Sequence, residues 1–145
     1  MNDTQPIKDI KKIQKLKKLM EKDGKIEELA LTTILLNTGL RVSDVLGWKF
    51  KDVFENTGKV KDGIFIVEKK TAKKKLLAFN INVKESLTKL KPKNNLEDYI
   101  FSSRSNNNIN GHWRRNYVNS FLNYYGNKVG IQSISPHSLR KTMGW

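Results

Sequence analysis

Residues 25–37 constrain the fold more than any other segment, because their apolar side chains cover more than one side of a helix. Leu29, Leu31 and Leu35 cannot share a single stripe at 3.6 residues per turn, as a helix on the surface of a domain requires. We therefore expect a helix at the centre of the molecule, covered by other elements. Gly39 follows it and should cap it, since glycine readily takes the left-handed conformation.

Other segments show either helical or alternating patterns. Helical spacing of apolar residues predicts an amphipathic helix at residues 7–20, a short one at 43–46, one at 83–90 and one that begins near Trp113. Residues 64–69 alternate with period two, and a lysine-rich turn and a second apolar strand at residues 76–81 follow, which predicts a β-hairpin. The aromatic stripe Trp113, Tyr117, Phe121 and Tyr125 is expected in the core, with base stacking as the alternative, and Ser135-Pro136 should begin a final helix.

The charge of the chain indicates its class of partner. The chain has 28 Lys and Arg residues and 14 Asp and Glu residues, which gives a formal charge of +14. An excess of this size is typical of a surface that meets a polyanion, so nucleic acid is the leading partner. The lysines of residues 8–18 fit a solvated helix face better than direct phosphate contact, because charge runs usually face water.

Composition also excludes several classes of site. The 145 residues contain no cysteine and only two histidines, which excludes disulfides, thiolate metal sites and a cysteine nucleophile, and argues against zinc. The absence of a long apolar run or an apolar leader favours a location inside the cell, away from membranes. The abundance of Lys, Asn and Ile hints at an A+T-rich genome, such as that of a bacterium or its mobile elements.

Three basic clusters could bind and activate a phosphodiester. In the first, Gly39 turns the chain sharply after the buried helix, so Arg41 lies at a rigid junction. A guanidinium can hold two phosphate oxygens at once, which lysine cannot do. Asp44 is close enough in sequence to hold that guanidinium, and the plain alternative is that Arg41 only pairs with Asp44.

The second cluster is the hairpin tip, where five lysines lie within residues 69–75. A lysine on a loop can donate a proton to a leaving oxygen if neighbouring cations tune its pKa. An electrostatic clamp on a phosphate backbone is the plainer interpretation.

The third cluster combines His137 and Arg140, three residues apart and so on one face of the predicted last helix. Both lie in its first turn, where unpaired backbone N–H groups and the helix dipole favour an anion.

Taken in order, these motifs resemble those of the tyrosine recombinases, which include phage and transposon integrases. The matching residues are Thr38-Gly39-Leu40-Arg41-Val42-Ser43-Asp44-Val45-Leu46, a Lys-Thr pair in a hairpin, and His137-Ser138-Leu139-Arg140. The resemblance covers about residues 25–145. It implies a mainly α (α+β) catalytic domain, a helical bundle with a small antiparallel β-sheet, over residues 1–145.

The resemblance also implies the roles of individual residues. Arg41, His137 and Arg140 would bind and polarise the scissile phosphate, supported by Asp44. Lys70 would be the general acid, with Lys69 as the alternative. The remaining tip lysines would contact double-stranded DNA: Lys69, Lys73, Lys74 and Lys75. A tyrosine would attack to form a 3′-phosphotyrosyl link, without metal, ATP or another cofactor, and with other recombinase protomers on the DNA rather than a small-molecule substrate.

This chain departs from the family pattern at several positions. Ala72 stands where the family often has glycine after the Lys-Thr pair, which suggests a longer turn, and Asp44 stands where it usually has glutamate. All four tyrosines precede His137, so we expect a domain incomplete at its C-terminus, without its nucleophile and without the family's core-binding domain. Such a chain would bind DNA, on the bacterial nucleoid in the cytoplasm, without cleaving it. The alternative is a non-catalytic DNA-binding module that competes for recombination sites; an unrelated RNA-binding protein ranks last.

Overall fold

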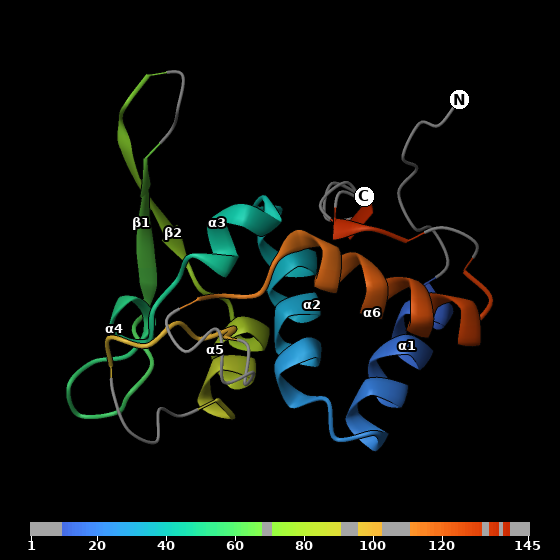
Figure 1. Ribbon diagram of the computed structural model, residues 1–145. Helices are drawn as coiled ribbons and strands as arrows, with labels where there is room; N and C mark the ends of the chain where they lie inside the picture. Colours follow the sequence, from blue (N-terminus) through green and yellow to red (C-terminus); the bar gives the residue numbers. More distant parts are fainter. Residues whose placement is uncertain are drawn as a thin grey trace.

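The computed structural model (Figure 1) describes residues 10–67, 71–90, 96–102, 111–131, 134–136, 138 and 139. These residues form α1 (Ile10–Lys22), α2 (Ile26–Thr38), α3 (Val42–Leu46), α4 (Phe50–Val53), β1 (Gly63–Val67), β2 (Lys74–Ala78), α5 (Ile81–Thr88) and α6 (Arg115–Lys128). Helices dominate, and β1 and β2 form one antiparallel pair. The predicted mainly helical fold with a small antiparallel sheet is therefore confirmed. No helix among the described residues is long and apolar enough to cross a membrane.

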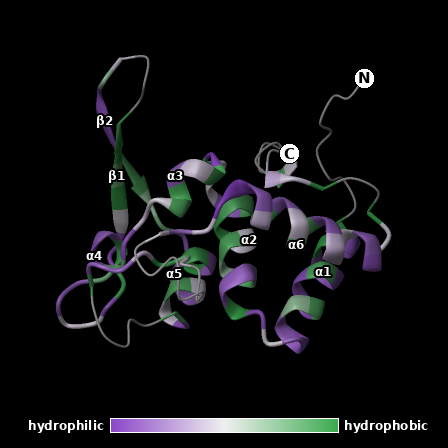
Figure 2. Ribbon diagram, in the orientation of Figure 1, coloured by the Kyte–Doolittle hydropathy of each residue, from purple (hydrophilic) through white to green (hydrophobic). Residues whose placement is uncertain are grey.

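The central position expected for α2 is confirmed. It packs against both α1 and α5, and Leu31, Ile34 and Leu35 are inaccessible to solvent. Hydrophobic residues line α2 where it passes between its neighbours (Figure 2). Gly39 ends the helix in the left-handed conformation, with φ of 69°, and its N–H donates to the carbonyl oxygen of Leu35 over 3.2 Å. The glycine thus satisfies a terminal carbonyl and turns the chain.

α6 packs against α1 and closes the bundle. Val118, Phe121 and Leu122 form its buried face. The expectation that the whole aromatic stripe belongs to the core is wrong for Tyr117, which is 40% exposed. Its ring remains at the surface because its hydroxyl reaches Glu28, and a phenol can combine apolar contacts with a polar end in this way. Tyr124, on the same helix, is also exposed.

The β-hairpin extends away from the helices (Figure 1). Gly63 lies opposite Ala78, and Val67 lies opposite Lys74. The predicted second strand, residues 76–81, is displaced: β2 begins at Lys74 and ends at Ala78. It ends early because Asn80 caps α5, its Oδ1 accepting a hydrogen bond from the N–H of Val83 over 3.0 Å.

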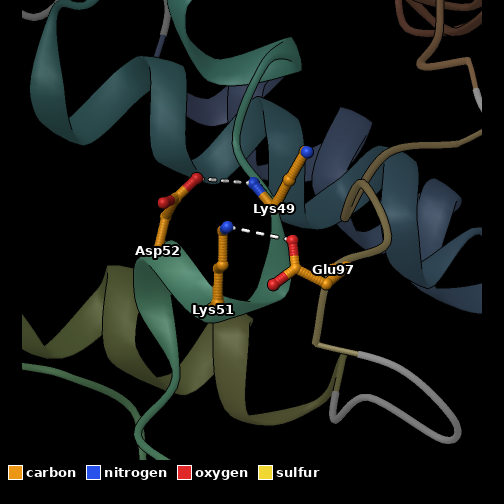
Figure 3. Close-up of polar contacts among 4 residues, drawn as sticks. All are labelled: Lys49, Lys51, Asp52 and Glu97. Carbon is orange, nitrogen blue, oxygen red and sulfur yellow. Dashed lines mark hydrogen bonds and ion pairs between the residues drawn. The ribbon is translucent and has the colours of Figure 1, made fainter.

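Sequence patterns did not predict α4, whose surroundings are shown in Figure 3. Asp52 accepts a hydrogen bond from the N–H of Lys49 over 2.8 Å at the helix start. The ammonium group of Lys51 lies 2.9 Å from the carboxylate of Glu97, and this contact lowers the pKa of Glu97. The backbone N–H of Lys51 donates to the carbonyl of Leu96. α4 therefore depends on residues far along the chain, which periodicity does not reveal.

The segment after α6 begins a helical turn where the sequence predicts one. The N–H of Ser138 donates to Oγ of Ser135 over 3.3 Å, and Pro136 follows this cap directly. Ile134 and Leu139 are buried on either side. The predicted N-cap and first-turn proline are confirmed, and two buried anchors fix the start of the segment that contains His137.

Candidate nucleic-acid interface

Arg41 lies between two fixed pieces of backbone. Before it, Oγ1 of Thr38 donates to the carbonyl of Ile34 over 2.7 Å and accepts from the N–H of Leu40 over 3.3 Å. At Arg41 itself the extended backbone caps α3, and its carbonyl accepts the N–H of Asp44 over 3.1 Å. The side chain of Arg41 is exposed. A guanidinium on a backbone held this way can meet a ligand with little reorganisation.

Asp44 does not form an ion pair with Arg41 within the described part of the chain, where the ion pairs are Lys51–Glu97 and Lys84–Asp62. Asp44 lies in the first turn of α3 and is half-buried. The interpretation that Arg41 serves only to pair with Asp44 therefore has no support here. The guanidinium donors face solvent and are available to an anion.

The lysines of the second cluster occupy different parts of the hairpin. Lys73 precedes β2, whereas Lys74 and Lys75 are its first two residues, and all three are exposed. Because successive side chains of a strand point to opposite faces, Lys74 and Lys75 place positive charge on both faces of the hairpin. Lys69 and Lys70 lie outside the described residues.

The third cluster can be located only through its neighbours, since His137 and Arg140 lie outside the described residues. Residues 134–136 run along the upper edge in Figure 1, the same edge at which α2 gives way to α3. Ile134 packs against α6 close to Gly126. The convergence of His137 and Arg140 with Arg41 on one surface stays a prediction.

Each of the four tyrosines has neighbours at its ring or hydroxyl, and Tyr124 lies edge-on to Tyr125 with the ammonium of Lys128 over its ring. Partial burial, followed by the carboxylate of Glu28, raises the pKa of Tyr117 far above its ordinary value. Burial, followed by Asp23, raises the pKa of Tyr125 to about 12, and its hydroxyl donates to Asp23 over 2.8 Å. The ring of Tyr99 lies edge-on to His112. A raised pKa opposes formation of the phenolate that attacks a phosphorus atom.

Two further features were not anticipated from the sequence. A cavity of about 640 Å³ lies at the N-terminal end of α2, the end opposite Arg41, and its lining includes Lys25, Glu27, Glu28, Trp113, Arg114 and Tyr117. Its charged residues have both signs and do not single out a ligand. A hydrogen-bonded group of asparagines also links α2 to the start of α5. The N-cap pattern at Asn80 was the available sequence signal for that group. Among the described residues no three potential metal ligands cluster.

Comparisons with known proteins identify the family and the fold. The model of the phage integrase family matches residues 8–145. A crystal structure of XerA recombinase superposes with a TM-score of 0.69 at 19% sequence identity, over 99% of this chain and 50% of that chain. This chain thus spans about half the length of the solved recombinase, and at this identity the likeness concerns the fold. A search of curated proteins gave no match.

Proposed function

Because the chain belongs to the phage integrase family, we propose that its 145 residues bind duplex DNA and activate a scissile phosphate for site-specific recombination. The family supports strand breakage and rejoining in general. The finer assignment is that cleavage proceeds through a 3′-phosphotyrosyl intermediate, whose retained bond energy makes metal and ATP unnecessary. Other recombinase protomers on the same DNA would complete the reaction.

The proposed roles divide among the three clusters. Arg41, His137 and Arg140 bind and polarise the phosphate, as cations placed where negative charge develops. Lys70, or Lys69 in its place, protonates the 5′ leaving oxygen. Lys73, Lys74 and Lys75 bind the DNA backbone.

One observation supports this proposal most strongly: Arg41 is exposed although its backbone is fixed on both sides. An arginine used only for stability would be expected to pair with a carboxylate, and Asp44 is available within three residues. A planar donor group presented to solvent from a rigid turn instead suits a tetrahedral oxyanion.

We test the role of Arg41 with Arg41→Lys, which keeps the charge but loses the two-pronged contact. Affinity for a duplex should fall about tenfold, since hydrogen bonds to charged groups contribute about 1.5–3 kcal/mol. Arg115→Lys is the matched control, because Arg115 is also exposed but begins α6. Equal losses in the two variants, measured by fluorescence anisotropy at fixed salt, would contradict a specific role for Arg41.

We also propose that none of the four tyrosines in these 145 residues is the nucleophile. The phenols of Tyr117 and Tyr125 donate to carboxylates, and an aligned attacking oxygen is required for covalent catalysis. Incubation with a nicked suicide duplex followed by denaturing electrophoresis should give no protein–DNA band, although the same duplex is bound. A covalent band would contradict this assignment, whereas absence of all duplex binding would contradict the proposed function.

If a longer reading frame supplies a tyrosine beyond residue 145, the longer chain should form the band. Arg140→Lys in that longer chain should then abolish most of it, because lysine cannot reproduce the bidentate contact. A longer chain that binds DNA but never forms the band would favour the alternative, a non-catalytic DNA-binding module.

A further inference from the structure

Three asparagines join the end of α2 to the residues that follow the hairpin. Oδ1 of Asn37 accepts a hydrogen bond from Nδ2 of Asn80 over 2.9 Å and from Nδ2 of Asn82 over 3.3 Å. Nδ2 of Asn37 donates to the carbonyl oxygen of Thr33 over 2.7 Å. That carbonyl can only accept, so the amide of Asn37 must point its nitrogen toward Thr33 and its oxygen toward the other asparagines.

Asn80 uses both ends of its amide. Its oxygen caps α5 through the N–H of Val83, and its nitrogen reaches Asn37. It lies two residues after the last residue of β2, so its position is tied closely to that of the hairpin. A single side chain therefore links the start of α5, the exit of the hairpin and the last turn of α2.

Asn37 is in turn close to Arg41 in the sequence. Three residues lie between them, and this backbone is held by the Gly39 cap and by Oγ1 of Thr38. The lysines of β2 and Arg41 thus lie on either side of the contact between Asn37 and Asn80. Hydrogen bonds hold the backbone on both sides: the Gly39 cap lies between Asn37 and Arg41, and β2 pairs with β1 before Asn80.

The remaining contacts of the hairpin hold its base. The N–H of Phe79 donates to the carbonyl of Asp62 over 2.8 Å, and its buried ring packs on Trp48 with centroids 5.9 Å apart. These contacts involve the residues that flank the two strands and the chain between α3 and α4. The contact between Asn37 and Asn80 joins the hairpin exit to the helix preceding Arg41, beside the bond from Asn82 and the packing of α5 on α2.

We propose that Asn37 and Asn80 are positioning residues that set the separation between Arg41 and the lysines of β2, so that both can contact phosphates of one duplex at once. This inference rests on the proposed function for its consequence in DNA binding. Its structural part, the fixed separation, can be tested without DNA. Neither asparagine needs to touch the reacting phosphate.

The variant Asn80→Ser separates the two functions of Asn80. Serine is as good an N-cap as asparagine, so α5 should keep its cap, but its side chain is too short to reach Asn37. Asn37→Ala removes the acceptor, whereas Asn37→Asp keeps an acceptor for Asn80 but gives up the bond to Thr33. Asn123→Ala on the exposed face of α6 is the matched control.

The separation can be measured by double electron–electron resonance between two spin labels. The chain has no native cysteine, so Ser43→Cys on α3 and Lys75→Cys on β2 give two unique sites, both exposed. We expect one narrow distance distribution in the parent and in the Asn37→Asp and Asn123→Ala backgrounds. Asn80→Ser and Asn37→Ala should broaden it while thermal unfolding remains that of the control. An unchanged distribution in Asn80→Ser overturns the proposal.

A double-mutant cycle in chains without labels tests the consequence for DNA. In the parent, the loss of duplex affinity in Arg41→Gln combined with Lys74→Gln should differ about threefold or more from the product of the single losses, as for coupled residues. In the Asn80→Ser background the losses should simply multiply. Equal coupling in both backgrounds overturns the inference. A parent that binds no duplex overturns the proposed function, and the distance measurement then decides the structural part alone.

Discussion

Ala72 has a left-handed backbone conformation, with φ of 56°, just before β2 begins. A residue with a Cβ atom pays about 1–2 kcal/mol for this conformation, which glycine adopts freely. The sequence suggested that alanine would avoid it by means of a longer turn. Alanine nevertheless adopts it, and residues 68–73 lie between the last paired residues of the hairpin, Val67 and Lys74.

Ala72→Gly should therefore stabilise the protein. The strain that is relieved is larger than the entropic cost of the more flexible unfolded chain. We expect a net gain of up to about 1 kcal/mol in the free energy of unfolding. Urea titration followed by circular dichroism measures it. Ala78→Gly, at an ordinary strand position of β2, should instead lose about 0.5–1 kcal/mol. A loss of stability in both variants would contradict strain at Ala72.

Tyr125 makes the free energy of unfolding depend on pH in the alkaline range. Its pKa is about 12 in the folded protein, against an ordinary value of 10.0, because it is buried and bonded to Asp23. A proton retained only in the folded state stabilises the fold below pH 10, and this contribution is lost as the pH rises toward 12. Tyr125→Phe should be less sensitive than the parent over this range in urea titrations. Parallel curves for the two proteins would show that Tyr125 does not contribute.

At the scale of elements, α6 and the following segment meet at a glycine. A Cβ atom on Gly126 would lie 2.5 Å from Cγ2 of Ile134, which is buried. The missing side chain lets Ile134 pack directly on the helix. Gly126 thereby sets how closely residues 134–136, and the cap formed by Ser135, approach the bundle.

Gly126→Ala should destabilise the protein although alanine favours helices by about 1 kcal/mol. Overpacking a filled core costs about 1–3 kcal/mol, so we expect a net loss of about 1 kcal/mol. Thermal unfolding measures the change. Asn127→Ala, one residue along and exposed, also gains helix propensity, without the clash, and should be neutral or stabilising. Stabilisation of both variants would show that Ile134 moves aside easily.

Elements with strong local signals were predictable from the sequence, and those that depend on distant partners were not. The burial of α2 and its end at Gly39 followed from an all-round apolar helix and a cap residue. The boundary between β2 and α5 was missed because Asn80 begins a helix within an apolar run that also suits a strand. α4 was missed since its backbone bonds with residues 96–98, far along the chain, help to hold it.

For the whole molecule, positive charge is widespread, so its location matters more than its total. Lys11, Lys15 and Lys18 lie exposed on α1, and Lys73, Lys74 and Lys75 lie exposed at the hairpin. Each triad contributes equally to the formal charge of +14. Only contacts that displace counterions from phosphates change the salt dependence of binding.

Replacing all three hairpin lysines by glutamine should reduce the slope of log K against log salt concentration by about three, since each phosphate contact contributes roughly one. The same replacement of Lys11, Lys15 and Lys18 on α1 should leave the slope nearly unchanged, because we expect a solvated face there. Both triple variants remove the same charge and are compared by anisotropy titrations over a range of salt. Equal slopes for the two variants would contradict a localised interface.

The candidate site was predictable in its residue types but less so in its pairings. The place of Arg41 beyond a capped helix followed from local rules. The expected support from Asp44 is not seen, because proximity in sequence does not decide which rotamers meet. The bond between Tyr117 and Glu28 joins residues 89 positions apart, and no local pattern encodes such a contact.

The packing of α1 against α6 has a consequence for the timing of folding during synthesis. Tyr125 bonds to Asp23, and Lys12 donates to the carbonyl of Gly130 over 3.0 Å, so α1 and the end of α6 depend on each other. At about 5–20 residues per second, the ribosome needs roughly 5–20 s to make the hundred residues between them. During that interval the side of α1 that meets α6 is uncovered. We expect nascent chains stalled before α6 to recruit chaperones that released chains no longer need.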